Sequence, residues 1–123
     1  MQSIMTHRAP AAIGPYSQAI AKNNTLFISG QLGIDPNSGT MPATFEEQTR
    51  LVFANIKAIL DAAGMGLSHI VKATVFLKDL DDFAILNEIY AQQFSAPYPA
   101  REAVQVARLP KDGLVEISVI AMR

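Results

Sequence analysis

The feature that most constrains this chain's fold is a long amphipathic helix, which the sequence predicts between Thr44 and Gly64. Thr44 and Glu47 have the capping-box spacing that marks a helix N-terminus, and Gly64 is a natural residue to end the helix. Apolar residues recur along one face at helical spacing: Phe45, Val52, Ile56, Ile59 and Ala63. A helix of roughly twenty residues is about 30 Å long, enough to cross a whole small sheet.

Strands are predicted on both sides of this helix. Before it, Thr25–Leu32 is rich in β-forming residues and follows the turn-prone pair Asn23-Asn24, and Tyr16–Ile20 is the expected hairpin partner. After it, the stretch from Val71 to Lys78 has an apolar residue at every second position. This alternation indicates a strand with one apolar face.

A second helix is predicted from about Asp81, with Phe83, Leu86, Tyr90 and Phe94 as its apolar stripe. Two more strands are expected at about Glu102–Arg108 and Leu114–Met122, separated by a turn at Pro110–Gly113. The predicted order is therefore β-β-α-β-α-β-β. Two helices cannot cover both faces of a sheet of this size, so we expect both on one face. The fold class is α+β, with a mixed β-sheet in a single domain over residues 1–123.

The amino-acid composition excludes several kinds of functional site and makes some partners unfavoured. The chain has no cysteine, which excludes disulfides, thiolate nucleophiles and cysteine-ligated metals. Its net charge is −1 with no basic run, so nucleic acid is an unfavoured partner.

No apolar stretch is close to the length of about 20 residues that spans a bilayer, and no export signal is apparent, so we expect a cytoplasmic protein. Asp79, Asp81 and Asp82 are explained by helix capping, so we expect no metal.

The last predicted strand indicates which side chains face the helices. Its wholly apolar set should pack against them and consists of Val115, Ile117, Val119 and Ala121. Glu116 then points to the uncovered face. In the preceding strand, Val104 and Val106 are interpreted as the core set, which places Arg101 on the same uncovered face as Glu116.

The uncovered face is expected to be an interface between copies of the chain. It carries apolar side chains that a monomer would expose: Phe76, Ala103, Ala107, Ile120 and Met122. If the last two strands form a simple hairpin, Glu116 lies roughly 17 Å along the strand from Arg101. That distance is too long to share a small substrate within one chain. We therefore predict a homo-oligomer packed through its sheets, in which the two residues can meet between neighbouring chains.

Arg101 is the best candidate for chemistry. It follows the stiff turn Pro97–Ala100, which would fix where its side chain starts, and a planar guanidinium suits a small carboxylate. The alternative is a surface salt bridge, for instance with Glu102. Glu116 is unusual as a carboxyl in an otherwise apolar strand, although a solvated position on an open face would also explain it.

Two segments near the N-terminus are weaker candidates. Ser29-Gly30 indicates a strand bulge, where backbone N–H groups become available to a ligand. Tyr16, within Gly14-Pro15-Tyr16-Ser17, is on its own most simply a turn-anchoring aromatic.

Five stretches of the chain together match one family at the same spacing. They are Ala9–Ala19, Ile28–Gln31, Asn87–Tyr90, Pro99–Arg101 and Val106–Asp112. In these stretches the chain resembles the Rid family of YjgF-type reactive intermediate deaminases, and within it the RidA subgroup. The resemblance runs from about residue 8 to the C-terminus.

The resemblance implies a chorismate-mutase-like α+β fold and a homotrimer with clefts between subunits. It also implies cofactor-free hydrolysis of 2-imino acids, such as 2-iminopropionate and 2-iminobutyrate, or their enamine tautomers, to 2-keto acids and ammonia. By matching position, Arg101 would bind the substrate carboxylate and Glu116 would hold or activate water. The cleft would be lined by Tyr16, Ser29, Gly30, Asn87 and the backbone at Ala103. An imine carbon is already electrophilic, so orientation and a proton-moving carboxyl suffice.

The chain departs from the family pattern beside the arginine. Members commonly have Ala-Arg-Ser followed by Cys or Thr, whereas this chain has Arg101-Glu102-Ala103. Adjacent strand residues point to opposite faces, so Glu102 is predicted to face away from Arg101. Two other functions are considered. One is a non-catalytic regulator that binds 2-keto acids through Arg101, and the other is a ribonuclease or translation inhibitor, which the neutral charge disfavours.

Overall fold

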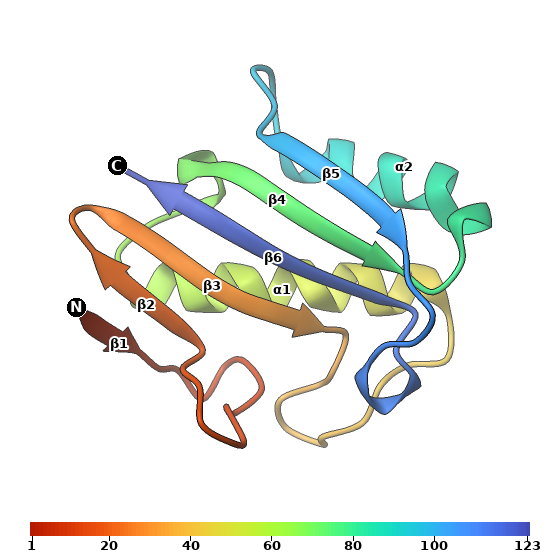
Figure 1. Ribbon diagram of the computed structural model, residues 1–123, viewed down its shortest axis with the longest axis horizontal. Coiled ribbons are helices and arrows are strands. Elements are labelled where there is room, and N and C mark those ends of the chain that lie inside the picture. Colours follow the sequence, from red (N-terminus) through yellow and green to blue (C-terminus); the bar gives the residue numbers. More distant parts are fainter.

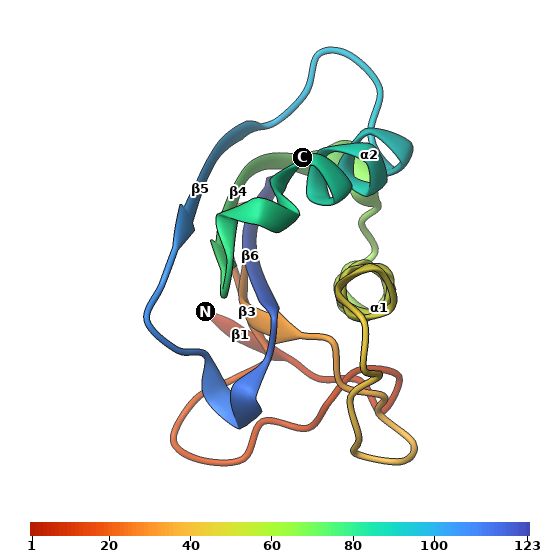
Figure 2. The same cartoon turned by 90° about the vertical axis from the view of Figure 1, so that its right-hand side faces the viewer.

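The computed structural model describes all 123 residues and contains one mixed six-stranded sheet and two helices. The strands are β1 (Gln2–Ile4), β2 (Ala19–Lys22), β3 (Thr25–Leu32), β4 (Ile70–Leu77), β5 (Ala100–Gln105) and β6 (Val115–Met122), and the helices are α1 (Phe45–Ala62) and α2 (Phe83–Gln93). Figures 1 and 2 show both helices on the same face of the sheet, as predicted. Neither helix is both long enough and apolar enough to cross a membrane.

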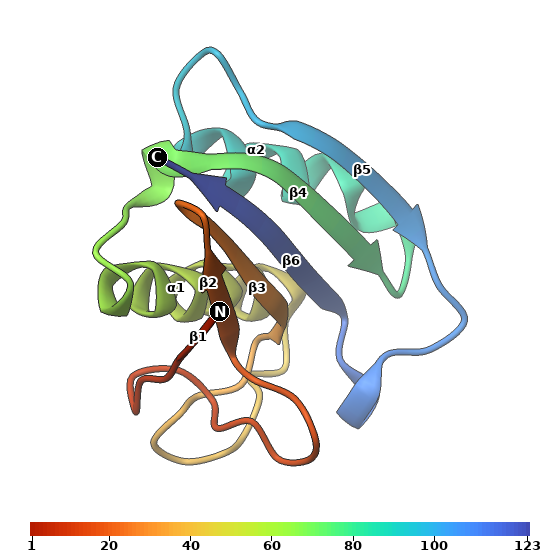
Figure 3. The same ribbon diagram turned by 60° about the vertical axis from the view of Figure 1, so that its left-hand side comes forward.

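The strands lie in the order β1-β2-β3-β6-β4-β5, and every neighbouring pair is antiparallel except β4 with β5. Strand β1 was not predicted, because three residues are too few to show an alternation. The expected hairpin between the last two strands is wrong. Strand β6 pairs with β3 and β4 in the middle of the sheet, while β5 lies at the outer edge beyond β4 (Figure 3). A parallel neighbour needs a long crossover connection, which α2 supplies between β4 and β5.

The first hairpin is shifted along the chain from its expected position. Strand β2 shares only Ala19 and Ile20 with the expected segment, and Tyr16 lies in the loop before it. The turn between β2 and β3 is made by Asn23 and Asn24, whose φ angles are 51° and 62°. Asparagine tolerates this left-handed region, and two such residues in succession match the twist of a tight hairpin.

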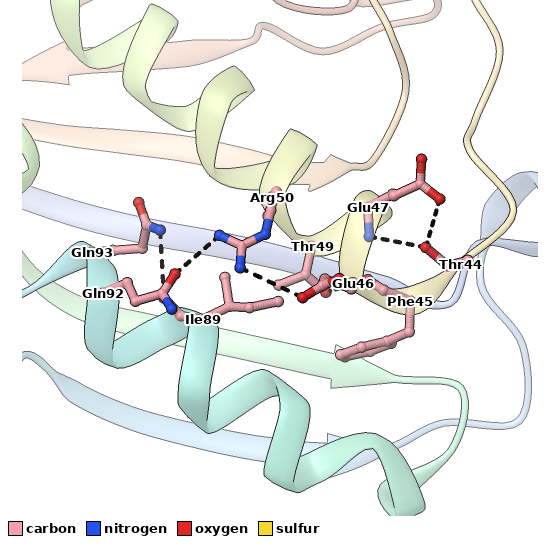
Figure 4. Close-up of polar contacts among 9 residues, drawn as sticks. All are labelled: Thr44, Phe45, Glu46, Glu47, Thr49, Arg50, Ile89, Gln92 and Gln93. Carbon is pink, nitrogen blue, oxygen red and sulfur yellow. Dashed lines mark hydrogen bonds and ion pairs between the residues drawn. The ribbon is translucent and has the colours of Figure 1, made fainter.

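Helix α1 begins as predicted. The Thr44 hydroxyl oxygen accepts from the Glu47 backbone N–H at 3.2 Å and donates to the Glu47 carboxylate at 2.8 Å (Figure 4). The helix is linked to α2 through Arg50, which donates to the Gln92 side-chain oxygen at 2.9 Å and lies 3.5 Å from Glu46. This contact fixes α2 beside α1 on the covered face of the sheet.

The core lies between the helices and the sheet. As expected, the buried set of β6 is Val115, Ile117, Val119 and Ala121. In β4, Ala73, Val75 and Leu77 are also buried, but Val71, expected to belong to this set, is 44% exposed. The pairing of β4 with β6 shifts between Ile70 and Lys72, so that Ile70 occupies the buried position instead. A bulge of this kind changes which residues face the core.

The other face of the sheet is open and carries several apolar side chains among polar ones. Phe27, Val104 and Met122 are each between 45% and 49% exposed. Phe76 and Ile120 are half-buried beside them. The prediction of apolar side chains on this face is confirmed for Phe76, Ile120 and Met122. Exposed apolar side chains gathered on one face of a sheet are typical of an interface.

Candidate functional site

The register of β5 turns Arg101 toward the helices. Arg101 is paired with Ala73 of β4, which is buried against the helices, and residues paired in register point to the same face. The expectation that Arg101 shares the open face with Glu116 is therefore wrong. The error comes from the two residues that follow Glu102: Ala103 packs against the core, whereas Val104 lies on the open face.

The Arg101 guanidinium lies over α2 without a counter-ion. Its Nη1 donates to the side-chain oxygen of Asn87 at 2.9 Å. Its Cζ lies 4.8 Å from the centre of the Tyr90 ring and 5.4 Å from that of Phe83. None of the four ion pairs in the chain includes Arg101. A guanidinium has five N–H donors, so donors remain for an anion.

Glu102 faces away from Arg101, and this prediction is confirmed. Its carboxylate accepts from the Thr74 hydroxyl at 3.0 Å and lies 3.2 Å from the Lys72 ammonium. The hydrogen bond from Lys72, together with that from Thr74, lowers the pKa of the Glu102 carboxyl. It therefore stays ionised and bound on the open face, where it does not compete for the guanidinium.

Glu116 lies on the open face, paired in register with Phe76 of β4 and Leu32 of β3. Burial raises the pKa of its carboxyl, and no neighbouring charge offsets this effect. Like Arg101, it enters none of the chain's ion pairs. A carboxyl with a raised pKa holds its proton more strongly than an ordinary one, so it is a stronger proton acceptor once ionised, which suits general acid–base chemistry.

The structure brings Gly30 directly against Glu116. The pairing of β3 with β6 shifts between Ile28 and Gln31, which confirms the predicted bulge. A Cβ added at Gly30 would lie 2.8 Å from Cδ of Glu116, closer than carbon atoms pack. Only glycine therefore leaves room for the carboxyl in this position. The backbone N–H of Ser29 donates to the Gln18 carbonyl at 2.9 Å, so it is not one of the free N–H groups that a bulge would offer to a ligand.

Tyr16 lies in the N-terminal loop, 56% exposed. The loop is held by Gln18, which is buried and bonds to the backbone of Thr6 at 2.8 Å and of Pro10 at 2.7 Å. Ser29 adds a hydrogen bond from its hydroxyl to the Ser17 carbonyl at 2.6 Å. The loop is thus attached to the start of the bulge that holds Gly30.

Within one chain, the predicted site residues form two separate groups. Arg101 and Asn87 lie on the helix side, whereas Glu116 and Gly30 lie on the open side. Arg101 is level with Ala73 and Glu116 with Phe76, so they are about 10 Å apart along the strands and about 10 Å across them. Their side chains also point to opposite faces. Two hollows of about 310 and 420 Å³ lie near the N-terminal segments, and neither is lined by Arg101 or Glu116.

Sequence reasoning missed the part that Phe83 and Tyr90 take in this site. Both belong to the apolar stripe predicted for the second helix, but their contact with Arg101 depends on where β5 pairs. The available signal was their spacing relative to Asn87, because residues 83, 87 and 90 fall on one face of a helix. No group of three or more acidic or histidine side chains is arranged to hold a metal ion.

Comparisons with known proteins agree on one family. Residues 6–123 match the family described as endoribonuclease L-PSP. A 2-iminobutanoate/2-iminopropanoate deaminase from Bos taurus is 51% identical over 121 residues, covering 98% of this chain and 88% of that protein. The crystal structure of RidA from an Antarctic Psychrobacter has a TM-score of 0.97 and 54% identity, with both chains fully covered. E. coli TdcF with bound serine has a TM-score of 0.96 and 49% identity, covering 100% of this chain and 99% of that one.

Proposed function

Because this chain belongs to the endoribonuclease L-PSP family, which includes the YjgF and Rid proteins, we propose that it is a reactive intermediate deaminase. It hydrolyses 2-imino acids, or their enamine tautomers, to 2-keto acids and ammonia. Support comes from relatives of about half identical sequence that carry the name 2-iminobutanoate/2-iminopropanoate deaminase. The observation that carries the proposal is the half-buried Arg101 guanidinium, which has no counter-ion within the chain.

Arg101 binds the substrate through its carboxylate. A guanidinium and a carboxylate form two parallel hydrogen bonds, which fix the plane of the substrate as well as its position. In a 2-imino acid the reacting carbon is directly bonded to the carboxylate carbon. Fixing the carboxylate therefore fixes the imine, and orientation of this kind supplies much of the rate enhancement.

Glu116 moves the protons. Its carboxylate takes a proton from water as the water oxygen adds to the imine carbon, and it passes that proton to the imine nitrogen, which gives a carbinolamine. Glu116 then takes the proton of the carbinolamine hydroxyl and passes it to the nitrogen, so that the C=O bond forms as the C–N bond breaks, ammonia leaves and the 2-keto acid remains. The raised pKa of Glu116 suits both steps. In this proposal Tyr16, Ser29, Gly30 and the backbone at Ala103 line the cleft, and Asn87 supports Arg101.

The complete site lies between two copies of the chain. Arg101 and Glu116 point to opposite faces of one sheet, so one small substrate cannot contact both within a single chain. We propose a homotrimer packed through its open sheet faces, in which each cleft takes Arg101 from one subunit and Glu116 from the next. The apolar open face, including Phe27 and Met122, is the surface that would be buried.

The central experiment follows the loss of 2-iminobutyrate generated in situ by an amino acid oxidase. Wild type should exceed the spontaneous rate, and both Arg101→Ala and Glu116→Ala should lose most of that excess. A wild-type rate no greater than the spontaneous one contradicts the deaminase. If 2-ketobutyrate still binds in that case and binding requires Arg101, the chain is a 2-keto acid-binding regulator instead.

Subunit complementation tests the shared cleft. Co-refolding equal amounts of Arg101→Ala and Glu116→Ala should restore about one quarter of wild-type activity, because in a random ring about one cleft in four receives both intact residues. Each variant refolded alone is the control. No recovery in a mixture that light scattering shows to be trimeric would place the two residues in the same subunit's site.

A further inference from the structure

We propose that Phe83 and Tyr90 are positioning residues for Arg101. Their two rings form an aromatic seat that holds the guanidinium in the direction needed to bind a carboxylate. The inference rests on the proposed function, since it concerns how the substrate's carboxylate is bound. It goes beyond that function by assigning a role to two residues that do not themselves touch the substrate.

The seat is built on a single rigid element. Phe83, Asn87 and Tyr90 follow one another along one face of α2, which lies behind β5 in Figure 1. The guanidinium carbon is 5.4 Å from the Phe83 ring centre and 4.8 Å from that of Tyr90, and Asn87 accepts one N–H at 2.9 Å. Three contacts from one helix therefore fix the position of the guanidinium.

The type of contact matters for binding. A carboxylate partner would occupy the N–H donors at the edge of the guanidinium, which are the same donors that a substrate needs. Aromatic rings instead attract the face of the cation and leave its edge free. Only Asn87 takes one donor from the edge. The seat thus orders Arg101 without blocking it, which reduces the conformational entropy lost when substrate binds.

Tyr90 acts through its ring rather than its hydroxyl. The hydroxyl is buried and has no hydrogen-bond partner. Burial raises the pKa of the Tyr90 hydroxyl, and the nearby Arg101 charge lowers it by less than burial raises it. The phenol therefore remains neutral. From behind, the ring is held by Phe94 at 4.8 Å and by Phe53 at 6.0 Å between centres. The core therefore fixes Tyr90, and Tyr90 in turn fixes Arg101.

The test compares Phe83→Leu with Phe83→Tyr, which restores an aromatic ring, and with Tyr90→Phe, which removes only the hydroxyl. Ile85→Ala is the matched control, because Ile85 is a similarly exposed apolar residue on the opposite side of α2. The measurements are KM and kcat for 2-iminobutyrate, and calorimetric binding of 2-ketobutyrate, a stable carboxylate. Phe83 is 37% exposed, so its variants should fold, and thermal unfolding checks this.

Phe83→Leu should raise KM and weaken 2-ketobutyrate binding, each by roughly 2- to 30-fold, the range expected for one cation–π contact. Its kcat should change much less, and the other three variants should stay near wild type. The proposed role of Phe83 would be contradicted if Phe83→Leu bound 2-ketobutyrate as tightly as wild type, or if Ile85→Ala lost as much affinity as Phe83→Leu. These results leave the deaminase standing if wild type is active. Conversely, if wild type is inactive while its binding of 2-ketobutyrate still depends on Phe83, that result would contradict the deaminase function and leave the positioning role of Phe83 intact.

Discussion

Replacing Gly30 by alanine is predicted to separate activity from stability. A Cβ at this position would lie 2.8 Å from Cδ of Glu116, 3.0 Å from Oε2 and 3.1 Å from Cγ. All three atoms belong to the outer part of one side chain, and no backbone atom is among them. The φ angle of Gly30 lies outside the left-handed region that favours glycine, so the backbone itself can accept alanine. The side chain of Glu116 is what must move.

The size of the movement sets the size of the effect. An ordinary contact begins at 3.4 Å, so the Glu116 carboxyl must retreat by at least 3.4 − 2.8 = 0.6 Å. Misplacement of a reacting group by about 1 Å can reduce the rate about 100-fold, so we expect kcat to fall by roughly one to two orders of magnitude. Because a flexible side chain can swing aside, the free energy of unfolding should fall by less than the 1–3 kcal/mol that is typical of overpacking.

The matched control is Gly66→Ala. A Cβ at Gly66 would meet nothing within 4 Å, and its φ of −134° suits any residue. This variant should keep wild-type kcat and gain up to about 1 kcal/mol of stability from the loss of unfolded-state entropy. The measurements are imine hydrolysis under saturating substrate and thermal unfolding. Full activity in a folded Gly30→Ala would refute the assignment of Glu116 to proton transfer from this position.

Three further outcomes are expected. Because burial raises the pKa of Glu116, its ionised form opposes folding; Glu116→Gln should therefore gain Tm relative to wild type as the pH rises from about 4 through the raised pKa, and a constant difference across pH would contradict this. Glu102→Gln should leave KM nearly unchanged, since Glu102 is bound to Lys72 and Thr74 on the face opposite Arg101; a marked fall in KM would mean that it competes for the guanidinium. Thr44→Ala should reduce the free energy of unfolding by about 1 kcal/mol in urea titrations without changing kcat.

The parts of the fold that follow from local rules were predictable from the sequence. The cap at Thr44 needs only a hydroxyl and a glutamate three residues on, and the inward face of β6 needs only an unbroken alternation. For the same reason the orientation of Glu102 relative to its neighbour was predictable. In each case the residues that decide the outcome are close together in the sequence.

The errors arise where distant segments decide. Neighbouring strands usually form hairpins, so β5 was paired with β6, but the crossover through α2 makes β5 the parallel partner of β4. The face of β5 is then predicted from Val104, because valine is usually buried in preference to alanine. At the edge of the sheet, Ala103 packs inward under α2 and Val104 lies on the open face. The aromatic contacts of Arg101 could not be foreseen until this face was known.

The correction to β5 also explains why Arg101 and Glu116 are both available for chemistry. On one face, at short range, a guanidinium and a carboxylate form an ion pair, which lowers the pKa of the carboxyl and occupies the N–H donors of the guanidinium. Such a pair could neither bind a substrate carboxylate nor move a proton near neutral pH. Here the sheet separates the two groups, so Glu116 keeps a raised pKa and Arg101 keeps its free donors. An assembly that brings them together across a subunit boundary would leave the substrate between them, where it prevents the charges from pairing.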